Sequence, residues 1–118
     1  MRYNNYHKHD HVSNIFSPDT NTKAEEYIIK SLEYGHTNYF TTNHGSFGDI
    51  FEARTLCNKY GLRCIAGIEG YIVPDASEKD KRNYHIIVIP KTDEARKKMN
   101  YVSSMANIKG FYYKPRFF

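Results

Sequence analysis

The chain of 118 residues has no tryptophan, only two cysteines and no long apolar run. A transmembrane helix needs about 20 consecutive apolar residues, so we expect no membrane span. The N-terminus, with early asparagines and histidines, does not have the pattern of a signal peptide. Cys57 and Cys64 form no C-x-x-C motif, and we expect a reduced pair of core residues in a cytoplasmic protein. A disulfide or an extra metal ligand is the alternative.

The composition is that of one small globular domain, with 25% charged and 40% hydrophobic residues and a net charge of +4. Basic residues cluster at 79–82, 96–98 and 114–116. Solvated surfaces explain such clusters, and a phosphate-rich partner such as nucleic acid is also compatible with them. Eleven tyrosines could stack on bases, but we favour amphipathic positions at the rim of a barrel or an interface.

Strands and helices alternate along the sequence. The pattern predicts strands at 3–8, 38–42, 63–73 and 84–89, and helices at about 23–34, at 47–60 and from Thr92 onward. The predicted buried helix positions are Ala24, Tyr27, Ile28, Leu32, Ile50, Ala53, Leu56, Cys57, Ala95, Met99, Val102 and Ala106. The alternation indicates an α/β protein with a parallel sheet or an α/β barrel.

Helix ends are also marked in the sequence. Thr22 and Glu25 have the spacing of a capping box, and Gly35 and Gly61 stand where the first two helices should end.

Metal-ligand side chains stand at the edges of the predicted strands: His7, His9, His44, Glu69 and His85. Imidazole nitrogens and a carboxylate suit zinc, manganese or iron, and such a metal makes hydroxide available near neutral pH. In an α/β barrel the site lies at the carboxyl ends of the strands, which fits all of these except His85. His85 begins its strand, so it joins them only if that strand runs antiparallel or the preceding strand returns to the rim.

Several motifs in order resemble the polymerase-and-histidinol-phosphatase (PHP) domain at the N-terminus of bacterial and phage DNA polymerase III alpha subunits. They are Tyr6-His7-Lys8-His9 followed by Ser13, Thr42-Asn43-His44-Gly45, Gly67-Ile68-Glu69-Gly70-Tyr71, Tyr84-His85-Ile86-Ile87-Val88 and the segment 110–116. The sequence as a whole is similar in character to that of a phage-encoded polymerase.

The resemblance implies a distorted seven-stranded α/β barrel, of which residues 1–118 would form roughly the first half. It also implies up to three divalent ions (Zn, Mn, Mg or Fe), with phosphoester hydrolysis such as 3′–5′ exonuclease proofreading in active members. In other members the domain is a structural platform. By position, the implied metal ligands are His7, His9, His44, Glu69 and His85, with Glu69 bridging two ions. Asp19 is the candidate for a further ligand, and His11 is its alternative.

Two departures from the family stand out. Asn43 occupies a position where the family often has aspartate, which removes a supporting carboxylate. The remaining family ligands would lie beyond residue 118, so we expect open strand edges and a C-terminal tail, including Phe117 and Phe118, without a covering partner. Lys114 and Arg116 could bind phosphate near the site, or could anchor a loop.

Three hypotheses follow. The first is an N-terminal piece of a replicative polymerase, completed by a second polypeptide and reaching DNA through the assembled enzyme. The second is a non-catalytic half-domain that docks on a polymerase or another replication protein. The third is an independent metal phosphoesterase that pairs with another copy of itself.

Overall fold

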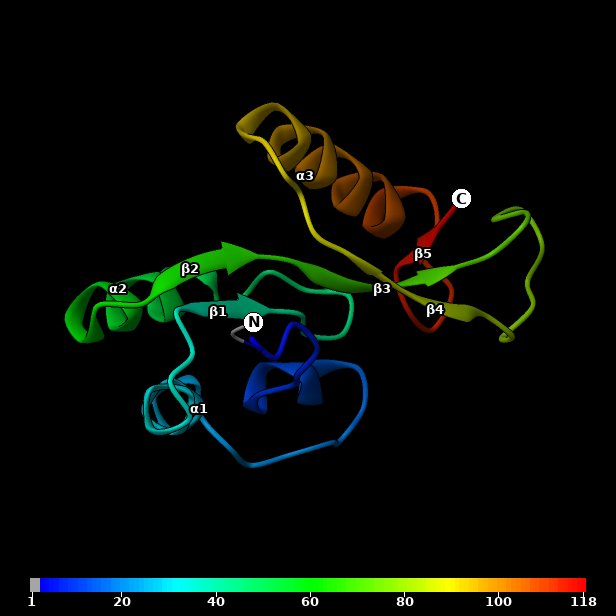
Figure 1. Cartoon of the computed structure of the whole chain (residues 1–118). Helices are drawn as coiled ribbons and strands as arrows, with labels where there is room; N and C mark the ends of the chain where they lie inside the picture. Colours follow the sequence, from blue (N-terminus) through cyan, green and yellow to red (C-terminus); the bar gives the residue numbers. More distant parts are fainter. Residues whose placement is uncertain (1–2) are drawn as a thin grey trace.

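The computed structural model describes residues 3–118 as a mixed α/β chain (Figure 1). In order, the elements are η1 (His11–Ile15), α1 (Ala24–Glu33), β1 (Asn38–Thr41), α2 (Ile50–Tyr60), β2 (Arg63–Ala66), β3 (Ile68–Ile72), β4 (Tyr84–Val88), α3 (Asp93–Ile108) and β5 (Arg116–Phe117). From α1 to α3 the elements follow the predicted order, except that the predicted strand at 63–73 is divided into β2 and β3.

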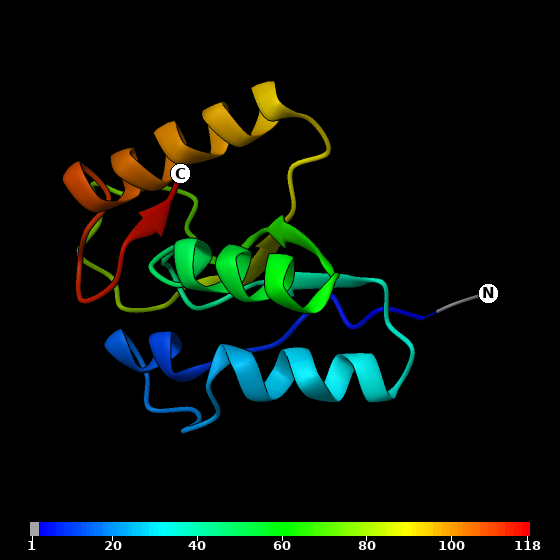
Figure 2. The same ribbon diagram turned by 90° about the vertical axis from the view of Figure 1, so that its left-hand side faces the viewer.

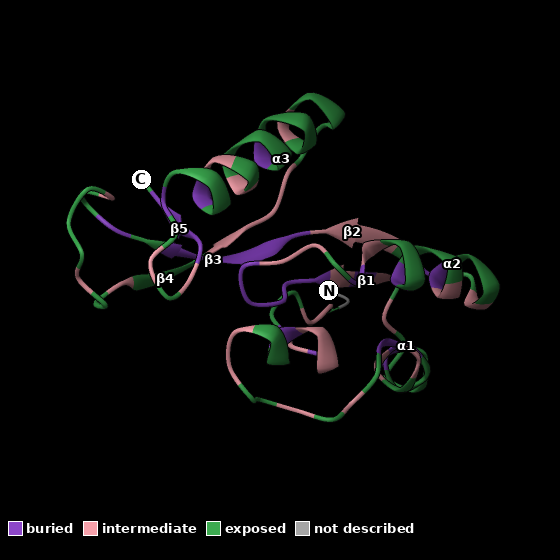
Figure 3. Cartoon of the chain, turned by 180° about the vertical axis from the view of Figure 1, so that it is seen from behind, coloured by how far each residue is buried: buried purple, intermediate pink, exposed green. Residues whose placement is uncertain are grey.

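The strands of residues 3–118 form two open sheets and no closed barrel. β1 and β2 pair in parallel, while β3 lies between antiparallel β4 and parallel β5. Helices α1 and α3 lie on opposite sides of the strands in both views (Figures 1 and 2). One apolar core joins α1 and α2 to the first sheet, and a second joins α3 to β3 and β5. Figure 3 shows β3 as the most continuously buried strand.

The predicted N-terminal strand at 3–8 is wrong, because this segment forms no ladder with a neighbouring strand. Side chains that follow β1 take the place of a strand partner. The hydroxyl of Thr42 accepts from the backbone N–H of Lys8 and donates to the Lys8 carbonyl, both at 2.9 Å. Asn43 then accepts from the backbone N–H of Asp10 at 2.9 Å. The segment is thus held beside the end of β1 by side chains.

The predicted strand at 63–73 is interrupted at Gly67 and continues into the other sheet. An added Cβ at Gly67 would lie 2.9 Å from the carbonyl oxygen of Thr41. Only glycine allows the chain to approach that backbone so closely. The interruption lets β2 pair with β1 while Glu69, two residues later, enters β3.

The first helix begins one residue later than predicted. Lys23 is the N-cap, and its backbone N–H donates to the Glu26 carboxylate at 3.4 Å. The predicted pair of Thr22 and Glu25 does not form the capping box, because Glu25 accepts a 2.8 Å hydrogen bond from Tyr60. Glu25 therefore links α1 to α2.

Two predicted core positions on the helices are exposed. On α1 the buried stripe runs from Ile28 to Ser31, which turns Leu32 outward with 39% exposure. On α3 the buried stripe joins Met99 to Ala106, and Val102 lies beside it with 41% exposure. The second helix begins at Ile50 rather than 47, and it ends as predicted at Gly61, which has a positive φ of 78°.

The expectation of an uncovered tail is wrong for Phe117. Its side chain is 7% exposed and packs with Ile68, Met99 and Ala106. The short strand β5 makes this packing possible, because Phe117 pairs with Ile72 at the end of β3. Apolar side chains of the same segment that do remain exposed are Phe111, Tyr113 and Phe118.

Candidate metal centre

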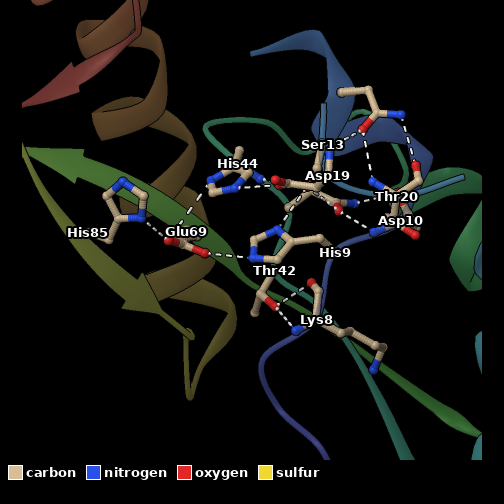
Figure 4. A network of polar contacts seen from close by, with 12 residues as sticks. Lys8, His9, Asp10, Ser13, Asp19, Thr20, Thr42, His44, Glu69 and His85 are labelled. Atoms are coloured by element: carbon tan, nitrogen blue, oxygen red, sulfur yellow. Dashed lines mark hydrogen bonds and ion pairs between the residues drawn. The ribbon is translucent and has the colours of Figure 1, made fainter. Parts of the chain in front are cut away.

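Glu69 lies at the centre of the predicted site, on the buried strand β3 (Figure 4). β4 runs antiparallel to β3, so His85 lies opposite Tyr71, two residues beyond Glu69. Because alternate strand residues share one face, Glu69, Tyr71 and His85 point to the same side of the sheet. The antiparallel strand thus explains how a residue at the start of β4 reaches the others, and His85 Nδ1 contacts Glu69 Oε1.

His44 is placed by a backbone bridge between the end of β1 and β3. The N–H of Glu69 donates to the carbonyl of Asn43 at 3.1 Å, and the N–H of Gly45 donates to the carbonyl of Glu69 at 2.8 Å. His44 and Glu69 are therefore direct neighbours across a parallel bridge. Gly45 has a positive φ of 56°, a conformation that glycine adopts without strain.

The N-terminal histidines complete the cluster on the other side of Glu69. His7 Nε2 and His9 Nε2 each lie 2.8 Å from Glu69 Oε2 and 3.1 Å from one another. Asp19 reaches the cluster as well, with its Oδ2 2.7 Å from His44 Nε2. The alternative residue, His11, has its nearest carboxylate contact with Asp10 at 4.0 Å and belongs to no ligand group of the described residues.

Among residues 3–118, three overlapping groups could each hold a metal ion: His7, His9 and Glu69; His9, Asp19 and His44; and His44, Glu69 and His85. Within each group the ligand atoms lie within 4.8 Å of one another. Among the described residues, His44 Nδ1 is buried without a hydrogen-bond partner, 3.9 Å from Glu69 Oε1. A free imidazole nitrogen facing a carboxylate fits a bound cation. Nitrogen and oxygen donors of this kind suit zinc, manganese and iron.

The electrostatics of the cluster favour the forms that bind metal. Burial lowers the pKa of His9, and the neighbouring His44 lowers it further. Burial alone would raise the pKa of Glu69, but the hydrogen bond from His7 and the charges of His44 and His9 outweigh it, and the pKa is lowered. A neutral imidazole and an ionised carboxylate are the ligand forms that metal binding requires.

Tyr71 supports the cluster, a role that the sequence patterns did not reveal. The ring of His44 stacks on His9, with centroids 4.2 Å apart, and on Tyr71 at 5.7 Å. Tyr71 also meets His85 edge-on at 5.2 Å. The spacing of Glu69 and Tyr71, two residues apart on one strand, was the available signal that both share a face.

The two basic candidates for phosphate binding have different surroundings. Lys114 is half-buried beside the cluster, with Nζ 4.4 Å from the ring centroid of Tyr71. Arg116 is 3% exposed, and its guanidinium donates to backbone carbonyls. Those carbonyls belong to Gly110 (2.8 Å), Glu78 (2.7 Å), Ala76 (2.7 Å) and Asp80 (3.4 Å). The contacts of Arg116 match the loop-anchoring alternative, and those of Lys114 leave it near the ligands.

The architecture and the cluster define an α/β domain with residues that could hold divalent ions. A model of the PHP domain matches residues 7–118, so the chain belongs to the PHP domain family.

Similar curated proteins are DNA polymerase III alpha subunits. The chain is 32% identical to that of Aquifex aeolicus over 92% of its length, 31% identical to that of Treponema pallidum over 93%, and 29% identical to that of Helicobacter pylori strain J99 over 98%. It spans about one tenth of the length of each relative, since each match covers 10% of that protein.

Proposed function

We propose that this chain is the N-terminal PHP piece of a DNA polymerase III alpha-like protein. It contributes metal ligands for phosphoester hydrolysis of the 3′–5′ exonuclease type once a second polypeptide completes the barrel. The observation that carries this proposal is the convergence of six ligand side chains from distant parts of the chain: His7, His9, Asp19, His44, Glu69 and His85.

The shared ligands support a site for more than one ion. Glu69 presents Oε2 to His7 and His9 and Oε1 to His44 and His85, so its two oxygens face different groups. A carboxylate in this position is suited to bridging two ions. The three groups together would accommodate up to three ions of zinc, manganese, magnesium or iron. When bound, such ions would supply hydroxide near neutral pH.

Lys114 is the better placed of the two residues proposed to bind phosphate. Its ammonium lies over Tyr71, whose ring stacks on the candidate ligand His44. A substrate phosphate at the ligands could receive a charge-assisted hydrogen bond from this ammonium. Arg116 donates to four carbonyls, so the contribution proposed for it is limited to its positive charge.

The open sheets support a role for a second polypeptide. β2 pairs only with β1, and β4 pairs only with β3, among the strands of residues 3–118. Unpaired strand edges are sites where another chain can add strands. We propose that the remaining polymerase polypeptide, or another copy of this chain, occupies these edges, and that DNA is reached through the assembled polymerase in the cytoplasm. None of the helices described between residues 3 and 118 has the length and apolar character to cross a membrane.

A non-catalytic binding module is the second candidate function. The exposed aromatic side chains near the C-terminus favour it, since Phe111 is 53% and Phe118 is 61% exposed. Such a module would dock on a polymerase or another replication protein. It would keep the ligand residues without carrying out hydrolysis.

Metal content decides the first step of the proposal. We expect purified protein to retain divalent metal and the variant His9→Ala/Glu69→Ala to lose it. The reason is that each of the three ligand groups contains His9, Glu69 or both. His36→Ala is the control, since His36 belongs to none of the groups. Elemental analysis with and without the candidate partner polypeptide measures this. Equal metal in wild type and the double variant would refute the metal function.

Hydrolysis requires a separate assay. We expect manganese-dependent removal of nucleotides from the 3′ end of single-stranded DNA by the assembled complex, and its loss in the His9→Ala/Glu69→Ala complex. A complex that forms and binds metal but does not cleave DNA would favour the binding module.

A further inference from the structure

A buried set of hydrogen bonds lies directly behind the candidate ligands. It consists of Ser13, Asn43 and Asp10, which are at most 3% exposed. We propose that these three side chains are positioning residues that hold His9 in its Nδ1–H form, so that Nε2 is free to bind metal. The inference rests on the proposed metal function, and it concerns side chains that hold a ligand rather than the ligands themselves.

The orientation of the Asn43 amide is fixed from both ends by Asp10. The backbone N–H of Asp10 donates to Asn43 Oδ1 at 2.9 Å. Asn43 Nδ2 in turn donates to the Asp10 carboxylate at 2.9 Å. If the amide were turned over, Asn43 Nδ2 would face the backbone N–H of Asp10 and Asn43 Oδ1 would face the Asp10 carboxylate. Neither pair could then form a hydrogen bond. Asn43 Oδ1 is therefore an acceptor at the position that faces Ser13.

The fixed amide determines the role of the Ser13 hydroxyl. Its single hydrogen donates to Asn43 Oδ1 at 2.8 Å. The Ser13 oxygen then has only lone pairs to offer, and one of them accepts from the backbone N–H of His44 at 3.1 Å. The other faces His9 Nδ1 at 2.9 Å. Because this oxygen can only accept there, Nδ1 of His9 must carry the hydrogen.

The form of His9 determines what it offers to the cluster. A neutral imidazole with hydrogen on Nδ1 has its lone pair on Nε2. His9 Nε2 is the atom that lies 2.8 Å from Glu69 Oε2 and 3.1 Å from His7 Nε2. The hydrogen bonds thus direct the free electron pair of His9 toward the centre of the ligand group, as expected for a histidine that binds metal (Figure 4).

The same geometry explains why asparagine occupies position 43. An aspartate there would place a second carboxylate at hydrogen-bond distance from Asp10, in a site where both residues are almost fully buried. Two such carboxylates cannot both ionise without a large penalty. A serine at position 10 would remove the conflict, because its oxygen can accept from Val12 as Asp10 does and its hydroxyl can donate to a carboxylate at 43.

Nuclear magnetic resonance of the metal-free 118-residue chain tests the proposal directly. Long-range proton–nitrogen spectra of protein with labelled histidine, at about pH 8 where imidazoles are neutral, distinguish the two forms. His9→Ala assigns the signal. We expect wild-type His9 in the Nδ1–H form and Ser13→Ala with a mixture of both forms. Wild-type His9 in the Nε2–H form would overturn the proposal whether or not any variant folds.

Zinc titration of the same proteins supplies the second readout. We expect about 10–100-fold weaker zinc binding by Ser13→Ala and by Asn43→Asp. The double variant Asp10→Ser/Asn43→Asp should recover the Nδ1–H form and most of the affinity. Unchanged affinity and an unchanged His9 spectrum in folded Ser13→Ala would refute the positioning role. A wild-type chain with the expected spectrum that binds no zinc would instead refute the metal function alone.

Discussion

The ring of Phe117 occupies the space that a side chain at Gly70 would need. An added Cβ at Gly70 would lie 2.5 Å from Cε2 of Phe117. Gly70 directly follows Glu69, so this contact fixes the strand that carries the central carboxylate. The last residues of the described chain therefore help to build the candidate metal centre from below the sheet.

The buried ring should contribute strongly to stability. We expect Phe117→Ala to lower the free energy of unfolding by about 3–5 kcal/mol, because it leaves a cavity against Ile68 and Met99. Phe118→Ala is the matched control, since Phe118 is 61% exposed and should change stability by less than about 1 kcal/mol. Urea unfolding followed by circular dichroism measures both. Equal effects of the two substitutions would contradict this packing.

Asp49 should destabilise the folded chain at neutral and higher pH. It is 1% exposed, and neither carboxylate oxygen has a hydrogen-bond partner among the described residues. Burial raises its pKa to about 7, and the neighbouring Asp10 adds to this. The unfolded carboxyl loses its proton near pH 3.9. The folded state therefore holds the proton more tightly, and its stability should fall as the pH rises from about 4 to about 7.

Asp49→Asn isolates this effect. We expect the variant to be more stable than wild type above pH 7, by on the order of 2–4 kcal/mol, and similar to it near pH 4. Glu52→Gln, an exposed carboxylate on the same helix, is the control and should show no such pH-dependent difference. Melting temperatures between these pH values provide the measurement. A difference that grows toward acid pH would have the wrong sign for a raised pKa.

The hydroxyl of Tyr71 should be dispensable while its ring is not. The oxygen is buried without a hydrogen-bond partner among residues 3–118, and burial raises the pKa of Tyr71 to about 12. We expect Tyr71→Phe to keep zinc affinity and to stabilise the chain by about 1 kcal/mol, because an unpaired polar group is removed. Tyr71→Leu should weaken zinc binding, since the stack on His44 is lost. Calorimetry of zinc binding compares the two.

The chain alone should have little nuclease activity. Under the proposed function, a second polypeptide completes the site that the ligand groups of residues 3–118 begin. A loosely held site loses the positioning on which catalysis depends. Incubation of the isolated chain with labelled single-stranded DNA and manganese measures this. Robust cleavage that is abolished by His44→Ala would show that the site is complete without a partner.

Local patterns predicted much of the fold, because helix caps and strand patterns act over a few residues. Gly61 and Thr92 mark helix ends as the sequence indicated. The division of the strand at Gly67 was not predictable, since its cause is the backbone of Thr41 in another strand. The missing N-terminal strand has a similar cause, because Thr42 satisfies the backbone of Lys8 with a side chain.

The candidate ligands could be named from the sequence because each stands in a recognisable motif. Their supports could not. Tyr71 and Ser13 act through neighbours that are distant in the sequence, and only the bridge between His44 and Glu69 brings those neighbours together. The antiparallel direction of β4, which places His85, depends equally on tertiary pairing.

Because the three ligand groups overlap, some residues are shared by two groups and others belong to a single group. His9, His44 and Glu69 each serve two groups, whereas His7, Asp19 and His85 each serve one. Filling one group would change the charge and geometry that the next ion meets, so successive ions should not bind independently. A family member that loses catalytic activity in evolution could therefore lose a residue of a single group and keep part of its metal. The loss of a shared residue would instead disrupt two ion sites together.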